Sequence, residues 1–223
     1  MDQVKAAIGK AAADLIQDGM LVGLGSGSTA SYFIQALAAR CKLGLQIQAA
    51  SSSAASTLLA RETGIPLVDI DTLSKLDITV DGADEIDPAK RMIKGKGGAL
   101  IREKILAKMS TEMVVIVDET KLVAALGTSP LPIEIIPFAY KATERHLHAA
   151  GFKGNWRLSK ENKFYITDNG NYIFDIVFNA PCAHPENDHT KLKLIPGVVD
   201  TGFFFDIAGR VIVGFKDNSI TVV

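Results

Sequence analysis

Two aspartates, a lysine and a glutamate lie close together in the sequence and could move protons as a group. Asp81 and Asp84 follow residues 78–80, an apolar run with the β-branched side chains of a buried strand. Lys94 opens a glycine-rich turn, and Glu103 follows that turn near the start of a predicted helix. Because α/β proteins bind ligands beyond the carboxyl ends of their strands, we expect a functional site here.

Each of these residues also has a purely structural interpretation. Asp81 and Asp84 could form an Asx turn and a helix cap. Glu103 could be a first-turn acid favoured by the helix dipole, and Lys94 could be a solvated lysine. A site is favoured because the aspartate stretch and the glycine-rich turn both combine demanding backbone geometry with charge.

A second glycine-rich segment, residues 23–30, joins a predicted strand to a predicted helix and is called the glycine loop below. Such a loop can cradle an anion with its backbone amides. It lacks the Gly-Lys-Ser/Thr of a P-loop, and no acid follows the next predicted strand, so ATP and NAD are disfavoured. The hydroxyls of Ser26, Ser28 and Thr29 suit a small phosphate ester, although a capped turn without a ligand stays open.

Composition narrows the class of protein. The chain has 223 residues, 48% of them hydrophobic, and a net charge of −1, which gives no field that would favour nucleic acid or an anionic membrane. No apolar stretch has the length of a spanning helix and the first residues do not resemble a signal peptide, so a cytoplasmic protein is expected. Cys41, Cys182 and the histidines have no metal-ligand spacing, which predicts neither a disulfide nor a structural metal site.

Alternating strands and helices predict an α/β fold with a doubly wound, mostly parallel, Rossmann-like sheet. The expected strands are 20–24, 45–49, 66–70, 78–80 and 113–117, with helices over 2–16, from about 30, over 51–63 and over 99–109. The strand 113–117 brings Lys121 to the same edge as Asp81.

The pattern changes near residue 128. A strand at 133–138 and a helix at 141–150 precede short strands at 155–158, 164–167 and 172–178 and a helix at 186–194, which predicts a smaller α+β domain over 128–202. A terminal hairpin, 211–215 with 220–223, is expected to return to the first domain. The predicted first domain is therefore 1–127 plus 203–223.

With these motifs in place, the chain resembles type A ribose-5-phosphate isomerases. The resemblance rests on motifs that follow the family's order and spacing over nearly the whole chain: residues 23–30, 51–53, 81–85, 94–98, 102–104, 130–134, 167–171 and 196–199. It implies an aldose-ketose isomerase that interconverts D-ribose 5-phosphate and D-ribulose 5-phosphate through an enediolate in the non-oxidative pentose phosphate pathway. It also implies a ferredoxin-like small domain, no metal or other cofactor, and a homodimer.

The resemblance also implies roles for individual residues. Glu103 matches the carbon base, Asp81 and Asp84 would handle hydroxyl protons, and Lys94 would offset the enediolate charge. The substrate-binding set that it implies is Ser26, Gly27, Ser28, Thr29, Asp81, Gly82, Ala83, Asp84, Lys94, Gly95, Lys96, Gly97 and Lys121.

Two positions depart from the family pattern. Ser26 replaces a threonine and keeps its hydroxyl. Lys96 replaces a glycine, which would cost about 1 kcal/mol if that residue needs a positive φ; alternatively the local turn differs, or the extra cation helps to hold an anion.

Related doubly wound folds also serve as non-catalytic sugar-phosphate sensors, deaminases and CoA transferases. A sensor would keep the glycine loop but would not need the set of Asp81, Asp84, Lys94 and Glu103. A CoA transferase would need a carboxylate nucleophile and a larger acyl-CoA surface. These residues therefore favour the isomerase.

Overall fold

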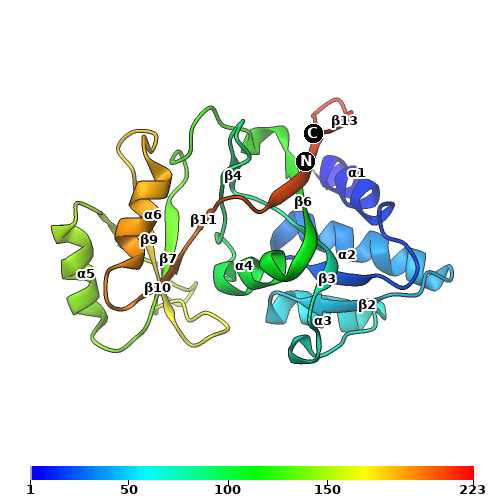
Figure 1. Cartoon of the computed structure of the whole chain (residues 1–223), viewed down its shortest axis with the longest axis horizontal. Helices are drawn as coiled ribbons and strands as arrows, with labels where there is room; N and C mark the ends of the chain where they lie inside the picture. The colour runs from blue at the N-terminus through cyan, green and yellow to red at the C-terminus, as the bar shows by residue number, and fades with distance from the viewer. Residues whose placement is uncertain (1) are drawn as a thin grey trace. The chain divides into compact units, whose positions relative to one another are not determined.

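The computed structural model describes residues 2–223, which form two compact units (Figure 1). The first unit runs through residue 83 and includes residues 102–122 and 207–223, and the second comprises residues 84–101 and 123–206. The second unit thus takes in the segment 84–101. The sequence-based division into 1–127 plus 203–223 and 128–202 stays a prediction about domains.

The first unit is built on a six-stranded sheet with the order β13-β12-β6-β3-β1-β2. Neighbouring strands of this sheet pair in parallel, except that β13 is antiparallel to β12. The strands are β1 (Leu21–Leu24), β2 (Gln48–Ser51), β3 (Leu76–Asp81), β6 (Ser110–Asp118), β12 (Ala208–Gly214) and β13 (Ile220–Val222). The predicted α/β class with a mostly parallel, doubly wound sheet is confirmed, as is the return of the terminal hairpin.

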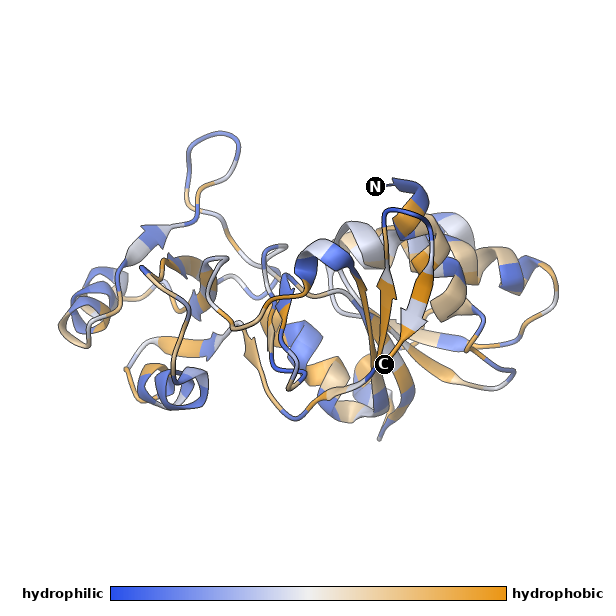
Figure 2. Cartoon of the chain, turned by 90° about the horizontal axis from the view of Figure 1, so that it is seen from above, coloured by the Kyte–Doolittle hydropathy of each residue, from blue (hydrophilic) through white to orange (hydrophobic). Residues whose placement is uncertain are grey.

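Helices pack on this sheet through apolar faces. They are α1 (Asp2–Ala13), α2 (Gly27–Lys42), α3 (Ala54–Thr63) and α4 (Leu100–Met109). Buried residues of α1 and α2, including Ile8 and Phe33, join those of the strands in one hydrophobic cluster. In Figure 2 the strands of this sheet are largely orange, the colour of hydrophobic residues. Leu106 of α4 packs in a separate cluster with Ala50 and Leu76.

The expected strand 66–70 is wrong. Leu67 forms a single parallel bridge with Ala49, and the chain then turns into a short 3₁₀ helix, η1 (Ile70–Thr72). Asp69 causes this change because its side chain accepts a hydrogen bond from the backbone N–H of Asp71 and so caps the turn.

The second unit contains a four-stranded antiparallel sheet with the order β10-β7-β9-β8. Its elements follow one another as β7 (Leu131–Ile135), α5 (Tyr140–Ala149), β8 (Gly154–Trp156), β9 (Tyr172–Ile176), α6 (Pro185–Lys193) and β10 (Val198–Thr201). This β-α-β-β-α-β order is the one that defines ferredoxin-like arrangements. The expected strand 164–167 is wrong, because this segment pairs only through isolated bridges at Phe164 and Ile166.

A second sheet in this unit has three very short strands in the order β11-β5-β4. They are β4 (Glu85–Ile86), β5 (Met92–Ile93) and β11 (Phe203–Phe204), and all pairings are antiparallel. Over residues 2–223, no helix is long and apolar enough to cross a bilayer.

Candidate active site

Asp81 lies at the carboxyl end of β3 and is fully buried. Its Oδ1 accepts hydrogen bonds from the backbone N–H of Ser26 at 2.9 Å and of Gly82 at 2.8 Å. Because β1 and β3 are parallel neighbours, their carboxyl ends bring the glycine loop against this carboxylate. A Cβ on Gly25 would lie 2.3 Å from the Asp81 carboxyl group, so only glycine fits at that position.

The hydroxyls of the glycine loop make contacts of their own. Ser26 precedes α2, but its side chain does not cap the helix; its hydroxyl lies 2.7 Å from that of Ser52. Ser28 Oγ accepts a hydrogen bond from Lys5 Nζ at 2.9 Å. Lys5 was missed by the sequence reasoning, which took α1 only as a core-facing helix, and no spacing in the sequence links this lysine to the loop.

Asp84 and Lys94 flank the open end of a hairpin. In this hairpin β4 pairs with β5 in the register Glu85 with Ile93, and Asp84 and Lys94 are the residues just outside this pairing. The backbone N–H of Asp84 donates to Ile93 O at 2.9 Å, so Asp84 and Glu85 both lie opposite Ile93. Lys94 is 3% exposed, and its Nζ lies 5.4 Å from the ring centroid of Phe204.

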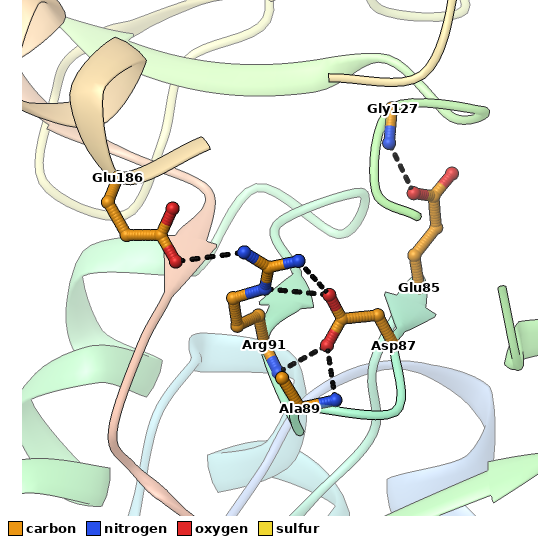
Figure 3. Close-up of polar contacts among 6 residues, drawn as sticks. All are labelled: Glu85, Asp87, Ala89, Arg91, Gly127 and Glu186. Carbon is orange, nitrogen blue, oxygen red and sulfur yellow. Dashed lines mark hydrogen bonds and ion pairs between the residues drawn. The ribbon is translucent and has the colours of Figure 1, made fainter. Parts of the chain in front are cut away.

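The tip of the same hairpin is held by Asp87 and Arg91 (Figure 3). Asp87 Oδ1 accepts from the N–H groups of Ala89 and Arg91, and Oδ2 accepts from the Arg91 guanidinium at 2.6 and 2.7 Å. Arg91 also donates to Glu186 at 3.0 Å, and this hydrogen bond lowers the pKa of Glu186. Glu85, on the other side of the tip, accepts from the N–H of Gly127 at 2.7 Å. The sequence reasoning did not single out Asp87 and Arg91, although the Asp-Pro pair at 87–88 was a signal for a tight turn.

Lys96 does not need the strained backbone that a glycine position could have required. Positive φ angles occur at Gly95 (102°) and Gly98 (84°), whereas Lys96 is not among the described non-glycine residues with positive φ. The cost of about 1 kcal/mol considered for a lysine with positive φ therefore does not apply. Its backbone N–H donates to Asp84 Oδ2 at 2.9 Å, so the 94–98 turn is tied to the carboxylate.

Glu103 and Lys121 belong to the first unit, with Asp81 and the glycine loop. Glu103 is 4% exposed in the first turn of α4, and Lys121 ends the 3₁₀ helix η2 (Glu119–Lys121). A pocket of about 280 Å³ lies in the second unit; its lining residues are Asp84, Lys96, Ser129, Pro130, Pro132, Arg157 and Asp175. The prediction that one substrate reaches all the expected residues stays a prediction.

The residues that the structure describes contain no cluster of three or more His, Cys, Asp or Glu side chains that could hold a metal ion. The predicted independence from metal stays a prediction that solution experiments can test.

Known proteins resemble this chain in sequence over nearly its whole length. Residues 48–218 match the family model described as ribose 5-phosphate isomerase A (phosphoriboisomerase A). A ribose-5-phosphate isomerase A of Protochlamydia amoebophila (strain UWE25) is 49% identical over 221 residues, covering 99% of this chain and 95% of the relative. One of Bacillus mycoides (strain KBAB4) is 46% identical, with 98% of each chain covered.

Solved structures of ribose 5-phosphate isomerases also resemble this chain over its whole length. Ribose 5-phosphate isomerase from Plasmodium falciparum superimposes with a TM-score of 0.96 at 35% identity, covering 100% of this chain and 98% of that one. A D-ribose-5-phosphate isomerase in complex with phospho-erythronic acid gives a TM-score of 0.94 at 39% identity, with the same coverage. The chain belongs to the ribose 5-phosphate isomerase A family.

Proposed function

We propose that this protein interconverts D-ribose 5-phosphate and D-ribulose 5-phosphate, as an aldose-ketose isomerase of the non-oxidative pentose phosphate pathway. The observation that carries the proposal is that Asp84 and Lys94 flank the open end of the β4-β5 hairpin, with Lys94 buried and the Asp84 carboxylate bonded to the backbone N–H of Lys96. A carboxylate and a buried ammonium at the same end of a hairpin suit a reaction that moves a hydroxyl proton while negative charge develops on the neighbouring oxygen.

The reaction moves one proton between two carbons. Glu103 takes the proton from C2 of the open-chain aldose, the electrons of that C–H bond form the enediolate, and Glu103 returns the proton to C1 to give the ketose. Asp81 and Asp84 exchange the hydroxyl protons of O1 and O2 and assist opening of the furanose. Lys94 stabilises the enediolate oxygens, and its burial makes this charge interaction stronger than it would be in water.

The glycine loop and the turns around it bind the substrate. The residues in this role are Ser26, Gly27, Ser28, Thr29, Gly82, Ala83, Gly95, Lys96, Gly97 and Lys121. Lys5 is added to this set, because its ammonium group donates a hydrogen bond to the Ser28 hydroxyl and brings a positive charge that suits a phosphate. The relative solved with phospho-erythronic acid supports binding of a phosphorylated sugar acid by that protein.

We propose further that the protein is a cytoplasmic homodimer that needs no cofactor. A non-catalytic sugar-phosphate sensor is less well supported, because the relatives that match over nearly full length are named as isomerases.

Turnover of ribose 5-phosphate by the purified protein tests the function directly. We expect ribulose 5-phosphate to form at the same rate before and after exhaustive EDTA treatment, because the roles above need only side chains of the chain. Absence of turnover would refute the isomerase, whereas loss on chelation with recovery on adding a divalent ion would show that Asp81 and Asp84 had been misread.

A further inference from the structure

Arg157, just after β8, makes its hydrogen bonds in two directions. Its Nε donates to Asp175 Oδ2 at 2.9 Å and its Nη2 to Asp175 Oδ1 at 2.5 Å, so the carboxylate of β9 fixes the guanidinium plane. Its Nη1 donates to the backbone oxygens of Gly95 and Lys96, both at 2.9 Å. The arginine side chain is only 15% exposed, so these bonds are shielded from water.

Tyr165 supports the same turn from the adjacent segment. The backbone N–H of Tyr165 donates to Arg157 O at 2.9 Å, next to the isolated bridge between Leu158 and Phe164. The hydroxyl of Tyr165 donates to Gly97 O at 3.0 Å, and its ring centroid lies 5.9 Å from the guanidinium carbon of Arg157. Three successive carbonyl groups of the turn, from residue 95 to residue 97, are thus held by two side chains.

These bonds determine where the amides of the turn point. The C=O and N–H of a trans peptide point in opposite directions, so a carbonyl held by Arg157 directs the N–H of the following residue away from it. The N–H of Lys96 accordingly meets Asp84 Oδ2 at 2.9 Å. By the same geometry, the bond to Lys96 O aims the N–H of Gly97 away from Arg157.

We infer that Arg157, oriented by Asp175 and assisted by Tyr165, is a positioning residue that holds the 94–98 turn in its catalytic conformation. It acts through the peptides on either side of Lys96, and so sets the Asp84 carboxylate and the Gly97 amide toward the substrate. This role rests on the proposed isomerase function. This role requires an arginine. The planar guanidinium group can donate to a carboxylate and to two carbonyl oxygens at once, whereas the single ammonium group of a lysine cannot.

The test compares Arg157→Ala with the wild-type protein in the ribose 5-phosphate assay. We expect kcat to fall by about 10-fold to 100-fold, since small misplacements of catalytic groups have effects of this size, while KM stays within about 3-fold. Guanidinium chloride at non-denaturing concentration should restore part of kcat in Arg157→Ala, and sodium chloride at equal ionic strength should not. Arg157→Lys should remain impaired, and Tyr165→Phe should lower kcat by a smaller factor.

Arg210 offers a matched control, because it makes a similar two-pronged pair with Glu112 at 2.7 and 2.8 Å in the first unit. Arg210→Ala should leave kcat and KM near wild type. The inference is overturned if Arg157→Lys and Tyr165→Phe both retain wild-type kcat, or if guanidinium does not distinguish Arg157→Ala from Arg210→Ala. Absence of turnover in the wild-type protein would instead refute the proposed function, so the two failures are distinguishable.

Discussion

Glu103, the proposed carbon base, lies in a buried part of the first unit. It lies in the first turn of α4 at 4% exposure, so water is largely excluded from its carboxylate. The position was predictable from the sequence because a glycine-rich turn followed by helix-forming residues marks a helix start. Its burial was not predictable in this way, since a first-turn glutamate of a surface helix has the same local pattern.

Replacing Glu103 with glutamine should lower kcat by about 10²-fold to 10⁴-fold, because the amide keeps the shape but cannot accept the proton from carbon. Binding of a substrate analogue should stay near wild type. In D₂O, the wild-type protein should place some deuterium on the carbon that receives the proton, since a carboxylic acid formed during the reaction can exchange with solvent. If Glu103→Gln still isomerises and exchanges at near wild-type rates, the base must be one of the aspartates, Asp81 or Asp84.

At the scale of elements, the hairpin β4-β5 shows what the sequence predicts and what it leaves out. Asp84 and Lys94 were predicted as site residues from their types, and in the structure they flank the open end of this hairpin. Strands of two residues are too short to show a period of two, so the hairpin itself could not be read from hydrophobic alternation. The contact of Lys5 with the glycine loop likewise arises from tertiary packing of α1 on α2, which no local pattern encodes.

Two segments, 66–70 and 164–167, were wrongly predicted to be strands. The segment 66–70 has the apolar residues of a strand, but Asp69 caps a 3₁₀ turn there and a side-chain hydrogen bond overrides a weak strand preference. The segment 164–167 begins with two consecutive aromatic residues, Phe164 and Tyr165. It pairs only at isolated bridges, and the Phe164 ring packs edge-on against Tyr140 and Trp156.

Asp87 should stabilise the hairpin that carries Asp84 and Lys94. It is 5% exposed and accepts four hydrogen bonds, two of them from the Arg91 guanidinium, so Asp87→Asn should destabilise the fold by about 1.5 to 3 kcal/mol. The variant should also lose kcat, because the open end of the hairpin loses its fixed geometry. Chemical unfolding and steady-state turnover measure the two effects.

Asp217→Asn is the matched control for this prediction. Asp217 accepts from the N–H and hydroxyl of Ser219 in an exposed hairpin turn of the first unit. Its replacement should leave both the unfolding midpoint and kcat near wild type. Equal losses in the two variants would mean that Asp87 has no special role in the hairpin.

At the scale of the whole molecule, the chain passes from one unit to the other several times. The first unit is assembled from three stretches of sequence, and the last of them contributes β12, which pairs in parallel with β6. The sequence predicted this return from the terminal hairpin pattern. The grouping of residues 84–101 with the second unit depends on long-range pairing of β5 with β11, and that pairing joins segments far apart in the sequence.

The two cysteines should report on opening of the fold through different thiol reactivity. Cys182 is 7% exposed, and its Sγ lies 3.2 Å from Asp188 Oδ2. Burial, with the hydrogen bond to Asp188, raises the pKa of the Cys182 thiol to about 12. Cys41 is less buried, and desolvation raises the pKa of its thiol as well. At pH 8, a thiol reagent should therefore modify Cys41 first and Cys182 only when the protein unfolds.

The raised pKa of Cys182 also predicts the direction of a pH effect on stability. The pKa of an unfolded cysteine thiol is near 9.0, whereas the pKa of the folded Cys182 thiol is about 12, so the unfolded state loses its proton first as the pH rises. The contribution to stability is therefore complete below pH 9 and is lost as the pH rises toward 12. Denaturant unfolding of Cys182→Ala between pH 8 and pH 10.5 should show a smaller loss of stability with pH than the wild-type protein, with Cys41→Ala as the control that follows wild type more closely. Equal slopes in all three proteins, or labelling of Cys182 as fast as Cys41 in the native state, would show that Cys182 is not held as a buried thiol.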